Sequence, residues 1–366
     1  MHPEATVVRL GHRQQRDKRI TSHLGLTARA LGAQHFVLCG DEDQSVLDTL
    51  GDVTENFGGN FNSEHQPKPM KWLKRFANDG GQIIHLTMYG QPYDVVVPEI
   101  PRDSPIAIVV GGAKGIGYCI AEQFAKEGCN VVIWDIDPNV EESAKTLAES
   151  TGVETRGIIA DATNYPQCEQ LAKEHVSESF NVQHVVYAAG AGSGKFGFPF
   201  WNLEPSDWPR IIDINLTGAV NITHAWVHNL KEHDSGSFGY ITSVAGQIGS
   251  QTDPPYSAAK AALINWMQVV AKDVAAYGLR ANCVSPGMVK TTINQSVWQS
   301  WYDQAADDER LDYDTWAESK IRNLSALGQW QTGDDIANAI VFLASNRARN
   351  MTGQTINVDG GWVLHS

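Results

Sequence analysis

Short apolar runs alternate with amphipathic stretches from residue 106 onward, and this alternation constrains the fold more than any other feature of the chain. Residues 106–110, 131–134 and 182–189 have the length and aliphatic composition of buried strands, and residues 116–126 and 165–176 have helical spacing. Strands and helices in this order predict right-handed βαβ units, in which helices cover both faces of a parallel sheet. The expected fold class is therefore α/β, with a doubly wound parallel sheet.

Three prolines within residues 98–105 separate this pattern from a smaller one before it. Because proline and the residue preceding it resist regular helix, such a segment is typical of a linker. We therefore expect one domain at residues 1–103 and a second at 104–366. The first has its own alternation, with strands expected at 6–10, 35–39 and 82–87 and helices at 21–31, 44–57 and 69–77, which predicts a smaller α/β unit.

The composition is that of a globular protein, with 42% hydrophobic and 19% charged residues. The apolar runs stop short of the ~20 residues that span a bilayer, and no basic and apolar leader follows Met1, so we expect a cytoplasmic protein without a membrane partner. The five cysteines form no C-x-x-C pair, and His224, His228 and His233 share one helical stretch without a carboxylate or cysteine to complete a ligand set. We expect buried thiols and no metal.

The net charge of −14 is distributed unevenly along the chain, since residues 1–103 carry about −2 and residues 104–366 about −12. An acidic body repels nucleic acid at long range. Five basic residues concentrate near the N-terminus: Arg9, Arg13, Arg16, Lys18 and Arg19. Any weak contact with tRNA would lie there, although a solvated loop stabilised by Asp17 accounts for the same residues equally well.

A glycine-rich segment, Gly111-Gly-Ala-Lys-Gly-Ile-Gly117, joins the strand at 106–110 to the helix that follows it. Glycines let a backbone turn tightly and approach a pyrophosphate, and a helix N-terminus offers free N–H groups to it. Eighteen residues after Gly117, Asp135 closes the next strand, where a carboxylate can accept hydrogen bonds from an adenosine ribose. These features predict a Rossmann dinucleotide site. A carboxylate there repels a 2′-phosphate and favours NAD over NADP, whereas Lys114 could favour NADP.

Tyr256 and Lys260 lie four residues apart in a helical stretch and therefore share one face. A phenol is a poor base at neutral pH, and a neighbouring ammonium is expected to lower the pKa of Tyr256. Ser243 lies thirteen residues upstream, where a strand opens into a loop at the carboxyl edge of the sheet. This edge is where α/β sheets bind their ligands.

These motifs, in this order, resemble the short-chain dehydrogenase/reductase family of NAD(P)-dependent oxidoreductases over residues 104–366. The resemblance implies that Tyr256 exchanges a proton with the substrate oxygen, Ser243 hydrogen-bonds that oxygen, Lys260 binds the nicotinamide ribose and lowers the Tyr256 pKa, and Asn215 supports a water relay. It also implies a homo-oligomer, a dimer or a tetramer. The cofactor residues expected on this basis are Gly111, Lys114, Gly115, Ile116, Gly117, Asp135, Ile136, Asp161, Ala162, Ala189, Gly190, Tyr256, Lys260, Pro286, Gly287, Val289 and Thr291. One departure is Tyr187-Ala-Ala-Gly190, where the family has Asn-Asn-Ala-Gly, so two side-chain hydrogen bonds are missing.

The substrate is expected to be a secondary alcohol or its ketone. Residues 291–333, where this family places a substrate lid, carry aromatic residues among acids, and these include Trp298, Trp301, Tyr302, Tyr313 and Trp316. The rings could stack on a polyol or pack the lid onto the body. Phe198 and Trp201 could form the opposite wall. A sugar-derived polyol and a 3-oxoacyl thioester both remain open.

The first hundred residues resemble a second family. The segment from Arg9 to His23, the helix 26–32 and the strand 85–90 are similar to the archaeal SPOUT-class tRNA (cytidine-2′-O)-methyltransferases over residues 5–111. That family binds its methyl donor in a knotted C-terminal half, and here the dehydrogenase begins instead. Three hypotheses follow: an NAD-dependent dehydrogenase with a truncated, non-catalytic SPOUT-like domain, a bifunctional protein that also methylates RNA, and a cofactor-binding scaffold that binds tRNA. The intact Asn215, Ser243, Tyr256 and Lys260 set argues against the scaffold, and the missing knot against methylation.

Overall fold

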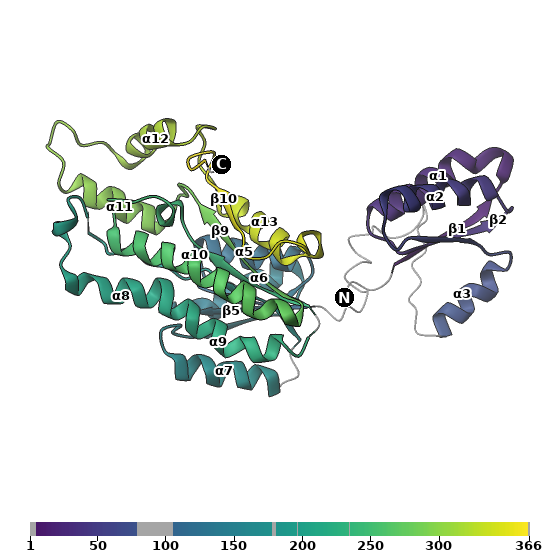
Figure 1. The fold of residues 1–366 in the computed structure, drawn as a ribbon, viewed down its shortest axis with the longest axis horizontal. Coiled ribbons are helices and arrows are strands. Elements are labelled where there is room, and N and C mark those ends of the chain that lie inside the picture. Colours follow the sequence, from purple (N-terminus) through teal and green to yellow (C-terminus); the bar gives the residue numbers. More distant parts are fainter. Residues whose placement is uncertain (1–4, 79–104, 178–180, 196, 234, 365–366) are drawn as a thin grey trace. The chain divides into compact units, whose positions relative to one another are not determined.

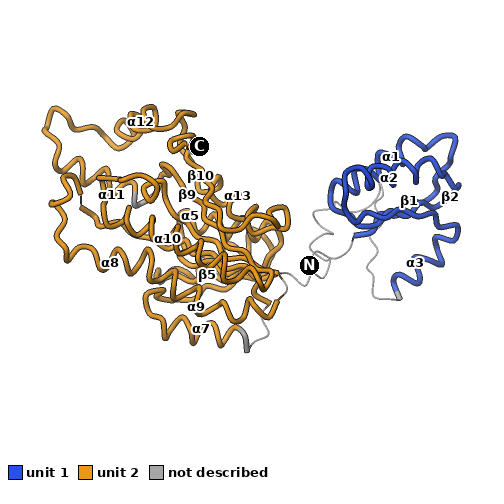
Figure 2. The backbone as a smooth tube through the Cα atoms, viewed as in Figure 1, with its two compact units in different colours: residues 1–103 blue, residues 104–366 orange. Residues whose placement is uncertain are grey.

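The computed structural model describes residues 5–78, 105–177, 181–195, 197–233 and 235–364. The chain divides into two compact units, residues 1–103 and 104–366 (Figure 2). The strand expected at 82–87 and most of the proline-rich segment lie outside the described residues. Within the described part, none of the helices combines the length and the apolar character needed to cross a bilayer.

Seven parallel strands form the sheet of the larger unit in the order β10-β9-β8-β7-β4-β5-β6. The strands are β4 (Ile106–Val110), β5 (Asn130–Asp135), β6 (Thr155–Ile159), β7 (Val182–Tyr187), β8 (Gly236–Ile241), β9 (Leu279–Pro286) and β10 (Thr355–Val358). From β4 the chain first builds outward through β5 and β6 and then returns to add β7 on the other side. The strand order therefore reverses between β4 and β7, and ligands of such sheets bind at the carboxyl ends of the strands there.

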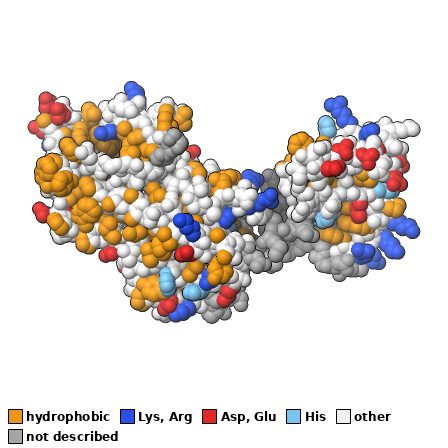
Figure 3. Space-filling view, in the orientation of Figure 1, with side chains coloured by type: hydrophobic (Ala, Val, Ile, Leu, Met, Phe, Trp, Pro, Cys, Tyr) orange, Lys and Arg blue, Asp and Glu red, His pale blue; other side chains and the backbone are white. Residues whose placement is uncertain are grey.

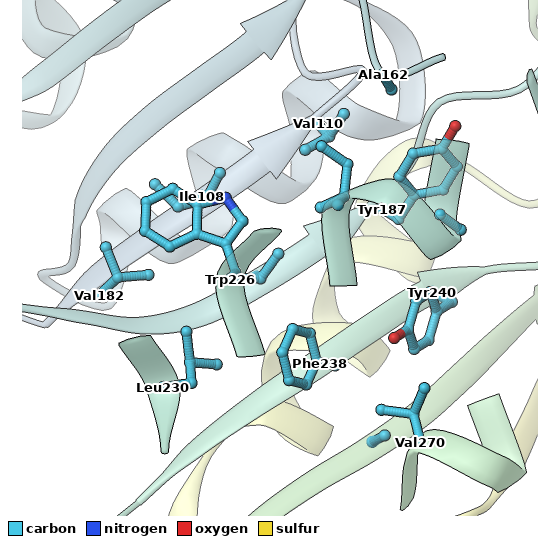
Figure 4. Close-up of a cluster of buried hydrophobic side chains, with 14 of the residues drawn as sticks. Ile108, Val110, Ala162, Val182, Tyr187, Trp226, Leu230, Phe238, Tyr240 and Val270 are labelled. Atoms are coloured by element: carbon cyan, nitrogen blue, oxygen red, sulfur yellow. The ribbon is translucent and has the colours of Figure 1, made fainter. Parts of the chain in front are cut away.

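Helices cover both faces of this sheet (Figure 1). They are α5 (Gly115–Lys126), α6 (Val140–Thr151), α7 (Tyr165–Ser177), α8 (Trp208–Ile212), α9 (Gly218–Leu230), α10 (Pro254–Val274), α11 (Thr292–Tyr302), α12 (Tyr313–Leu324) and α13 (Gly333–Ala344). Alternate residues of β4 enter different cores: Ile108 and Val110 join the side of α7, α9 and α10, and Ala107 and Val109 join the side of α5, α6 and α13. Figure 4 shows part of the first core, which includes Ile108, Trp226 and Phe238. The expected doubly wound α/β class is confirmed.

The smaller unit has a three-stranded parallel sheet of β1 (Thr6–His12), β2 (His35–Gly40) and β3 (Asn62–His65) in that order. Its helices are α1 (Gln14–Ala30), α2 (Gln44–Phe57) and α3 (Pro69–Asn78), and its core contains Phe36, Leu38, Val46, Leu50 and Phe61. α1 begins at Gln14, seven residues before the expected start at 21, so most of the basic cluster lies on a helix and not in a loop. The charged residues of this segment hide the helical spacing of the few apolar ones.

Candidate functional site

The glycine-rich turn after β4 depends on backbone positions that a side chain would block. Gly111 has a φ of +78°, and a Cβ there would lie 2.6 Å from backbone atoms of Ala189. A Cβ on Gly117 would collide with the carbonyl of Gly111, whereas Gly115, with a φ of +59°, faces open space. The turn therefore packs tightly against the chain after β7 and leaves the N-terminus of α5 accessible. These features fit the pyrophosphate of a dinucleotide.

Asp135 ends β5 beside this turn. Its Oδ2 accepts a hydrogen bond from the N–H of Ala113 at 3.0 Å, and its Oδ1 accepts one from the N–H of Asp137 at 3.0 Å. A carboxylate offers about four acceptor positions, so two remain for ribose hydroxyls. Lys114 lies 3.0 Å from Oδ2 of Asp137 and is mostly exposed, and Ile136 is exposed as well. The lysine that could favour a 2′-phosphate is thus engaged by a carboxylate.

Asn215 and Lys260 approach one backbone position, Gly190. Asn215 lies on η4 (Asp213–Thr217), a single π-helical turn, and is fully buried. Its Nδ2 donates to the carbonyl of Ala191 at 2.7 Å and to that of Ile211 at 2.9 Å, whereas its Oδ1 has no hydrogen-bond partner among the described residues. A Cβ placed on Gly190 would lie 3.0 Å from this oxygen and 3.3 Å from Nζ of Lys260. A buried acceptor without a partner here suits a bound water or ligand.

Tyr256 lies in the first turn of α10, next to Ser243. The Ser243 hydroxyl hydrogen-bonds the phenol, and Nζ of Lys260 lies 5.5 Å from the centre of the tyrosine ring. Lys260 is buried and donates to the carbonyl of Ile241, the last residue of β8, at 2.9 Å. The expected catalytic residues Asn215, Ser243, Tyr256 and Lys260 therefore come together at the carboxyl edge of the sheet, beside the strand-order reversal.

Burial dominates the electrostatics of this group and corrects one expectation. Desolvation raises the pKa of Tyr256 to about 12, the charge of Asp253 also acts to raise it, and the hydrogen bond from Ser243 opposes both. Desolvation lowers the pKa of Lys260 to about 8. We expected Lys260 to bring the Tyr256 pKa below its usual value. In this structure the pKa is raised, because the loss of solvent around the phenol is the largest effect.

The remaining predicted cofactor residues follow the ends of the strands. Asp161 comes two residues after β6, is exposed, and accepts hydrogen bonds from the N–H and the hydroxyl of Thr163 at 2.9 and 2.7 Å. Pro286 is the last residue of β9, and the N–H of Gly287 donates to Val358 at 3.1 Å. Thr291 caps α11, and four further residues fill the loops or the first turn of α5: Ile116, Ala162, Ala189 and Val289. All of them lie along one edge of the sheet.

Two functional positions escaped the sequence analysis. Asp253 caps the N-terminus of α10, and its two oxygens accept from the N–H groups of Tyr256 (3.4 Å) and Ser193 (2.7 Å). An aspartate directly before two prolines is a recognisable helix start and could have revealed it. Tyr187 replaces the family asparagine, and its buried hydroxyl donates to the carbonyl of Ile214 at 2.5 Å, within η4. The missing asparagine is thus replaced by a new contact that no motif predicts.

A cavity of about 240 Å³ borders this group and is lined by residues of the loop 190–195, by Thr252 and Asp253 and by one face of α11. A second cavity of about 480 Å³ shares Gly194, Lys195 and Ser300 with it. Together they reach the size of small-molecule sites. The hydroxyl of Ser300 donates to the carbonyl of Gly194 at 3.3 Å and so connects α11 to the loop opposite.

The aromatic residues of the lid pack against one another. The ring of Trp298 lies 5.8 Å from that of Tyr313, and Trp301 lies 6.2 Å from Trp316, in a cluster with the buried Met288. Phe198 and Trp201 are exposed and do not line either cavity. In this structure the aromatic residues of the lid therefore pack against one another and against the body, and their rings are not arranged around a substrate cavity.

In the smaller unit, Asp17 neutralises part of the basic cluster. Its carboxylate lies 2.7 Å from Nε of Arg16 and 3.8 Å from Arg9, and it accepts a hydrogen bond from the N–H of Arg13 at 3.2 Å.

Among the described residues of both units, no group of three or more His, Cys, Asp or Glu side chains is placed to hold a metal ion.

Comparison with known proteins gives two families. A family model described as enoyl-(acyl carrier protein) reductase matches residues 111–363. A model described as tRNA ribose 2′-O-methyltransferase matches residues 57–133, so its match begins later than the expected resemblance over 5–111 and extends into the glycine-rich turn and β5. The methyltransferase-like segment is thus confirmed as a similarity to that family.

Among curated proteins, 3-oxoacyl-[acyl-carrier-protein] reductase of Chlamydia muridarum is 30% identical over 256 residues, which covers 70% of this chain and 96% of that protein. The 2-(S)-hydroxypropyl-CoM dehydrogenase 3 of Xanthobacter autotrophicus is 30% identical over 259 residues, 70% of this chain and 95% of the relative.

Among solved structures, a protein from Beutenbergia cavernae described as a putative NAD(P)-dependent gluconate 5-dehydrogenase, with NADP bound at low occupancy, is 27% identical with a TM-score of 0.61, covering 70% of this chain and 96% of that one. L-sorbose reductase from Gluconobacter frateurii, complexed with NADPH and L-sorbose, has a TM-score of 0.65 over 72% of this chain and 98% of that one. At 23% identity, the second likeness establishes the fold alone.

Proposed function

The chain belongs to the short-chain dehydrogenase/reductase family, enzymes that act on CH–OH groups or ketones with NAD(P), and from this we propose that Tyr256 is the acid and base of its reaction. The observation that carries the proposal is the convergence of Ser243, Tyr256, Lys260 and Asn215 beside the glycine-rich turn. The nicotinamide cofactor, when bound, supplies or accepts the hydride.

Each residue has a role that its position supports. In reduction, the protonated Tyr256 hydroxyl gives its proton to the substrate oxygen, and in oxidation the phenolate removes it. Ser243, already hydrogen-bonded to the phenol, donates to the same substrate oxygen. Lys260, whose ammonium donates to the carbonyl of Ile241, would bind the nicotinamide ribose, and the unpartnered Oδ1 of Asn215 accepts from a water that connects to Lys260. The half-buried Tyr256, whose pKa desolvation raises to about 12, holds its proton at neutral pH and can give it to a ketone oxygen.

For the cofactor, we propose NAD in preference to NADP. Asp135 stands at the end of β5 with two acceptor positions left for ribose hydroxyls, and Lys114 is held by Asp137. The two solved structures described above contain NADPH and NADP. We therefore propose that this chain differs from them in its choice of cofactor. The glycine-rich turn would hold the pyrophosphate, and Asp161, Gly190 and residues 286–291 would complete the cofactor site.

For residues 1–103, we propose a truncated, SPOUT-like domain without catalysis of its own, in a cytoplasmic protein. The similarity to a tRNA methyltransferase favours a weak tRNA contact through Arg9, Arg13, Arg16, Lys18 and Arg19 as the second candidate function. The ion pairs with Asp17 reduce the charge available for it.

We also propose a homo-oligomer. Large apolar side chains are exposed on the larger unit, among them Trp208 and Val269, and Figure 3 shows several such groups on one face. Exposed apolar groups of this kind favour association between copies. Sedimentation of the full chain at micromolar concentration should give a dimer or a tetramer, and a monomer at every concentration would contradict this assembly.

The reaction is tested with the purified full chain, NAD or NADP, and a panel of polyols, ketoses and 3-oxoacyl thioesters, following nicotinamide absorbance. Turnover of at least one secondary alcohol or ketone is expected. A chain that binds the cofactor but oxidises and reduces nothing in the panel would support the scaffold hypothesis instead.

A further inference from the structure

We propose that the cavity beside Tyr256 binds a neutral, polyhydroxylated substrate, and that Asp253 selects it by accepting hydrogen bonds from substrate hydroxyls. This inference rests on the proposed function, because it names the substrate class of the same site. It chooses between the two classes that the sequence leaves open, a polyol or ketose and a 3-oxoacyl thioester.

Two residues of the cavity wall contact the reacting groups. Asp253 lies on its wall and accepts from the backbone N–H of Tyr256. Gly190 lies on the wall as well, at the position that Asn215 and Lys260 approach. A substrate whose carbonyl oxygen meets the Tyr256 hydroxyl would therefore extend the rest of its chain into this cavity.

Asp253 has acceptor capacity to spare. The residue is about nine-tenths buried, and the N–H groups of Ser193 and Tyr256 together with the side chain of Ser193 occupy up to three of the roughly four acceptor positions of its carboxylate. The capacity that is left rewards a substrate hydroxyl and penalises a substrate that cannot fill it, because a buried polar group left without a partner is costly.

The rest of the wall suits hydroxyl groups better than an acyl chain. Three residues with hydroxyl groups, Thr252, Ser296 and Ser300, line the cavity, and the aliphatic side chains among the described lining residues are Ala191 and Val297. An acyl chain gains about 0.8 kcal/mol for each CH₂ that it buries against apolar surface, and two small aliphatic groups provide little of it.

Charge at the two cavities disfavours an anionic substrate. Lys195 is held by both oxygens of Asp207, at 2.8 and 2.9 Å, so it contributes no net positive charge. Asp253 on the first cavity and Asp303 on the second have no described cation paired with them on these walls. Thioesters of phosphorylated carriers bring negative charge toward these carboxylates, which act against them.

The test compares kcat/KM for fructose, a polyhydroxylated ketone, with kcat/KM for acetoacetyl-coenzyme A, using the full chain with saturating cofactor. We expect fructose to be preferred at least ~10-fold, and Asp253→Asn to reduce this preference at least ~10-fold, mainly through the KM for fructose. The matched control is Asp312→Asn, which alters the same kind of helix cap, on α12, outside both cavities. The control should leave the preference within threefold.

Preference of the native chain for acetoacetyl-coenzyme A, or equal losses for both substrates in Asp253→Asn, would overturn the inference. Calorimetric titration of sorbitol into the chain with NAD separates the two proposals. Binding that Asp253→Asn weakens at least ~10-fold, without turnover of any alcohol, refutes the proposed function and supports the cavity assignment. Turnover of the thioester without affinity for sorbitol supports the proposed function and refutes the cavity assignment.

Discussion

Lys260 shows how burial and charge oppose each other at a single residue. Its ammonium is buried, hydrogen-bonded to the carbonyl of Ile241, and its pKa is lowered to about 8 by desolvation. The folded protein therefore holds this proton less tightly than the unfolded chain, in which lysine has its ordinary pKa of 10.5. The buried ammonium therefore lowers the free energy of unfolding at neutral pH, and it places a cation at the active site.

The corresponding prediction concerns the pH dependence of stability. Between pH 8 and 10.5 the unfolded chain binds more protons than the folded one, so the contribution of Lys260 to the free energy of unfolding rises with pH in this window. Relative to Lys260→Met, the native chain should gain about 1–3 kcal/mol from pH 7.5 to pH 10 in urea titrations without cofactor. A difference between the two proteins that does not change with pH would show that the lysine titrates normally.

Asp135 determines the predicted choice of cofactor. Its carboxylate would place like charges within a few ångströms of a 2′-phosphate, at a cost of more than ~1.4 kcal/mol, so kcat/KM should favour NAD over NADP at least tenfold. Asp135→Ser should remove most of this preference, and Lys114→Ala should change it little because Asp137 holds that lysine. Equal kcat/KM for both cofactors in the native chain would mean that Lys114 and not Asp135 controls the site.

At the scale of elements, β7 and η4 are held together by one tyrosine. The Tyr187 hydroxyl donates to Ile214 in the π-helical turn that carries Asn215, and a Cβ on Gly218 would collide with that hydroxyl. The glycine at the start of α9 therefore makes room for the tyrosine. This contact positions the asparagine without touching a substrate.

Tyr187→Phe should cost about 1–2 kcal/mol of stability and lower kcat roughly tenfold, because the carbonyl of Ile214 loses this hydrogen bond and Asn215 shifts. Gly218→Ala should destabilise the native chain more than it destabilises the Tyr187→Phe variant, since the new methyl group meets the hydroxyl. Chemical denaturation of the four proteins gives the coupling. If the changes in the free energy of unfolding of the two single variants add up to that of the double variant, the hydroxyl and the glycine do not interact.

Some of the helices, strands and site residues follow from the sequence, and others depend on the folded structure. The strands β4, β5 and β7 and the helix α2 lie where hydrophobic periodicity places them, because each buries an apolar face. β3 was not expected, since Asn62-Ser-Glu-His65 has no apolar residue and pairs with β2 only in the folded unit. In the site, motif spacing predicted Ser243, Tyr256 and Lys260. The pKa of Tyr256 and the role of Asp253 depend on burial and on a loop sixty residues away, which local pattern does not reveal.

At the scale of the whole molecule, one chain holds two compact units and is similar to two families. Every strand that the structure describes after Val110 belongs to the seven-stranded sheet of the larger unit, and no described segment there remains to form a methyl-donor knot. The smaller unit has a core of its own and a basic segment partly neutralised by Asp17.

We therefore predict that the full chain neither binds S-adenosylmethionine nor methylates tRNA. Calorimetry with the methyl donor should show no binding, and labelled-methyl transfer to unmodified tRNA should stay at background. Any tRNA binding should be weak and should fall with salt, with a log–log slope of about −0.7 to −0.9 per phosphate contact. Measurable donor affinity or transfer would show that residues assigned to the dehydrogenase complete a second active site.

The most direct measurement is the turnover of Tyr256→Phe beside that of the native chain, with NAD affinity measured on both. The ring still packs and Ser243 and Lys260 remain, but no proton can be exchanged with the substrate oxygen. Because general acid and base catalysis contributes ~10²–10⁴ in rate, kcat should fall at least ~10² while the Kd for NAD stays within a few fold. Near-native turnover in the phenylalanine variant would contradict the assignment of Tyr256 and the mechanism built on it.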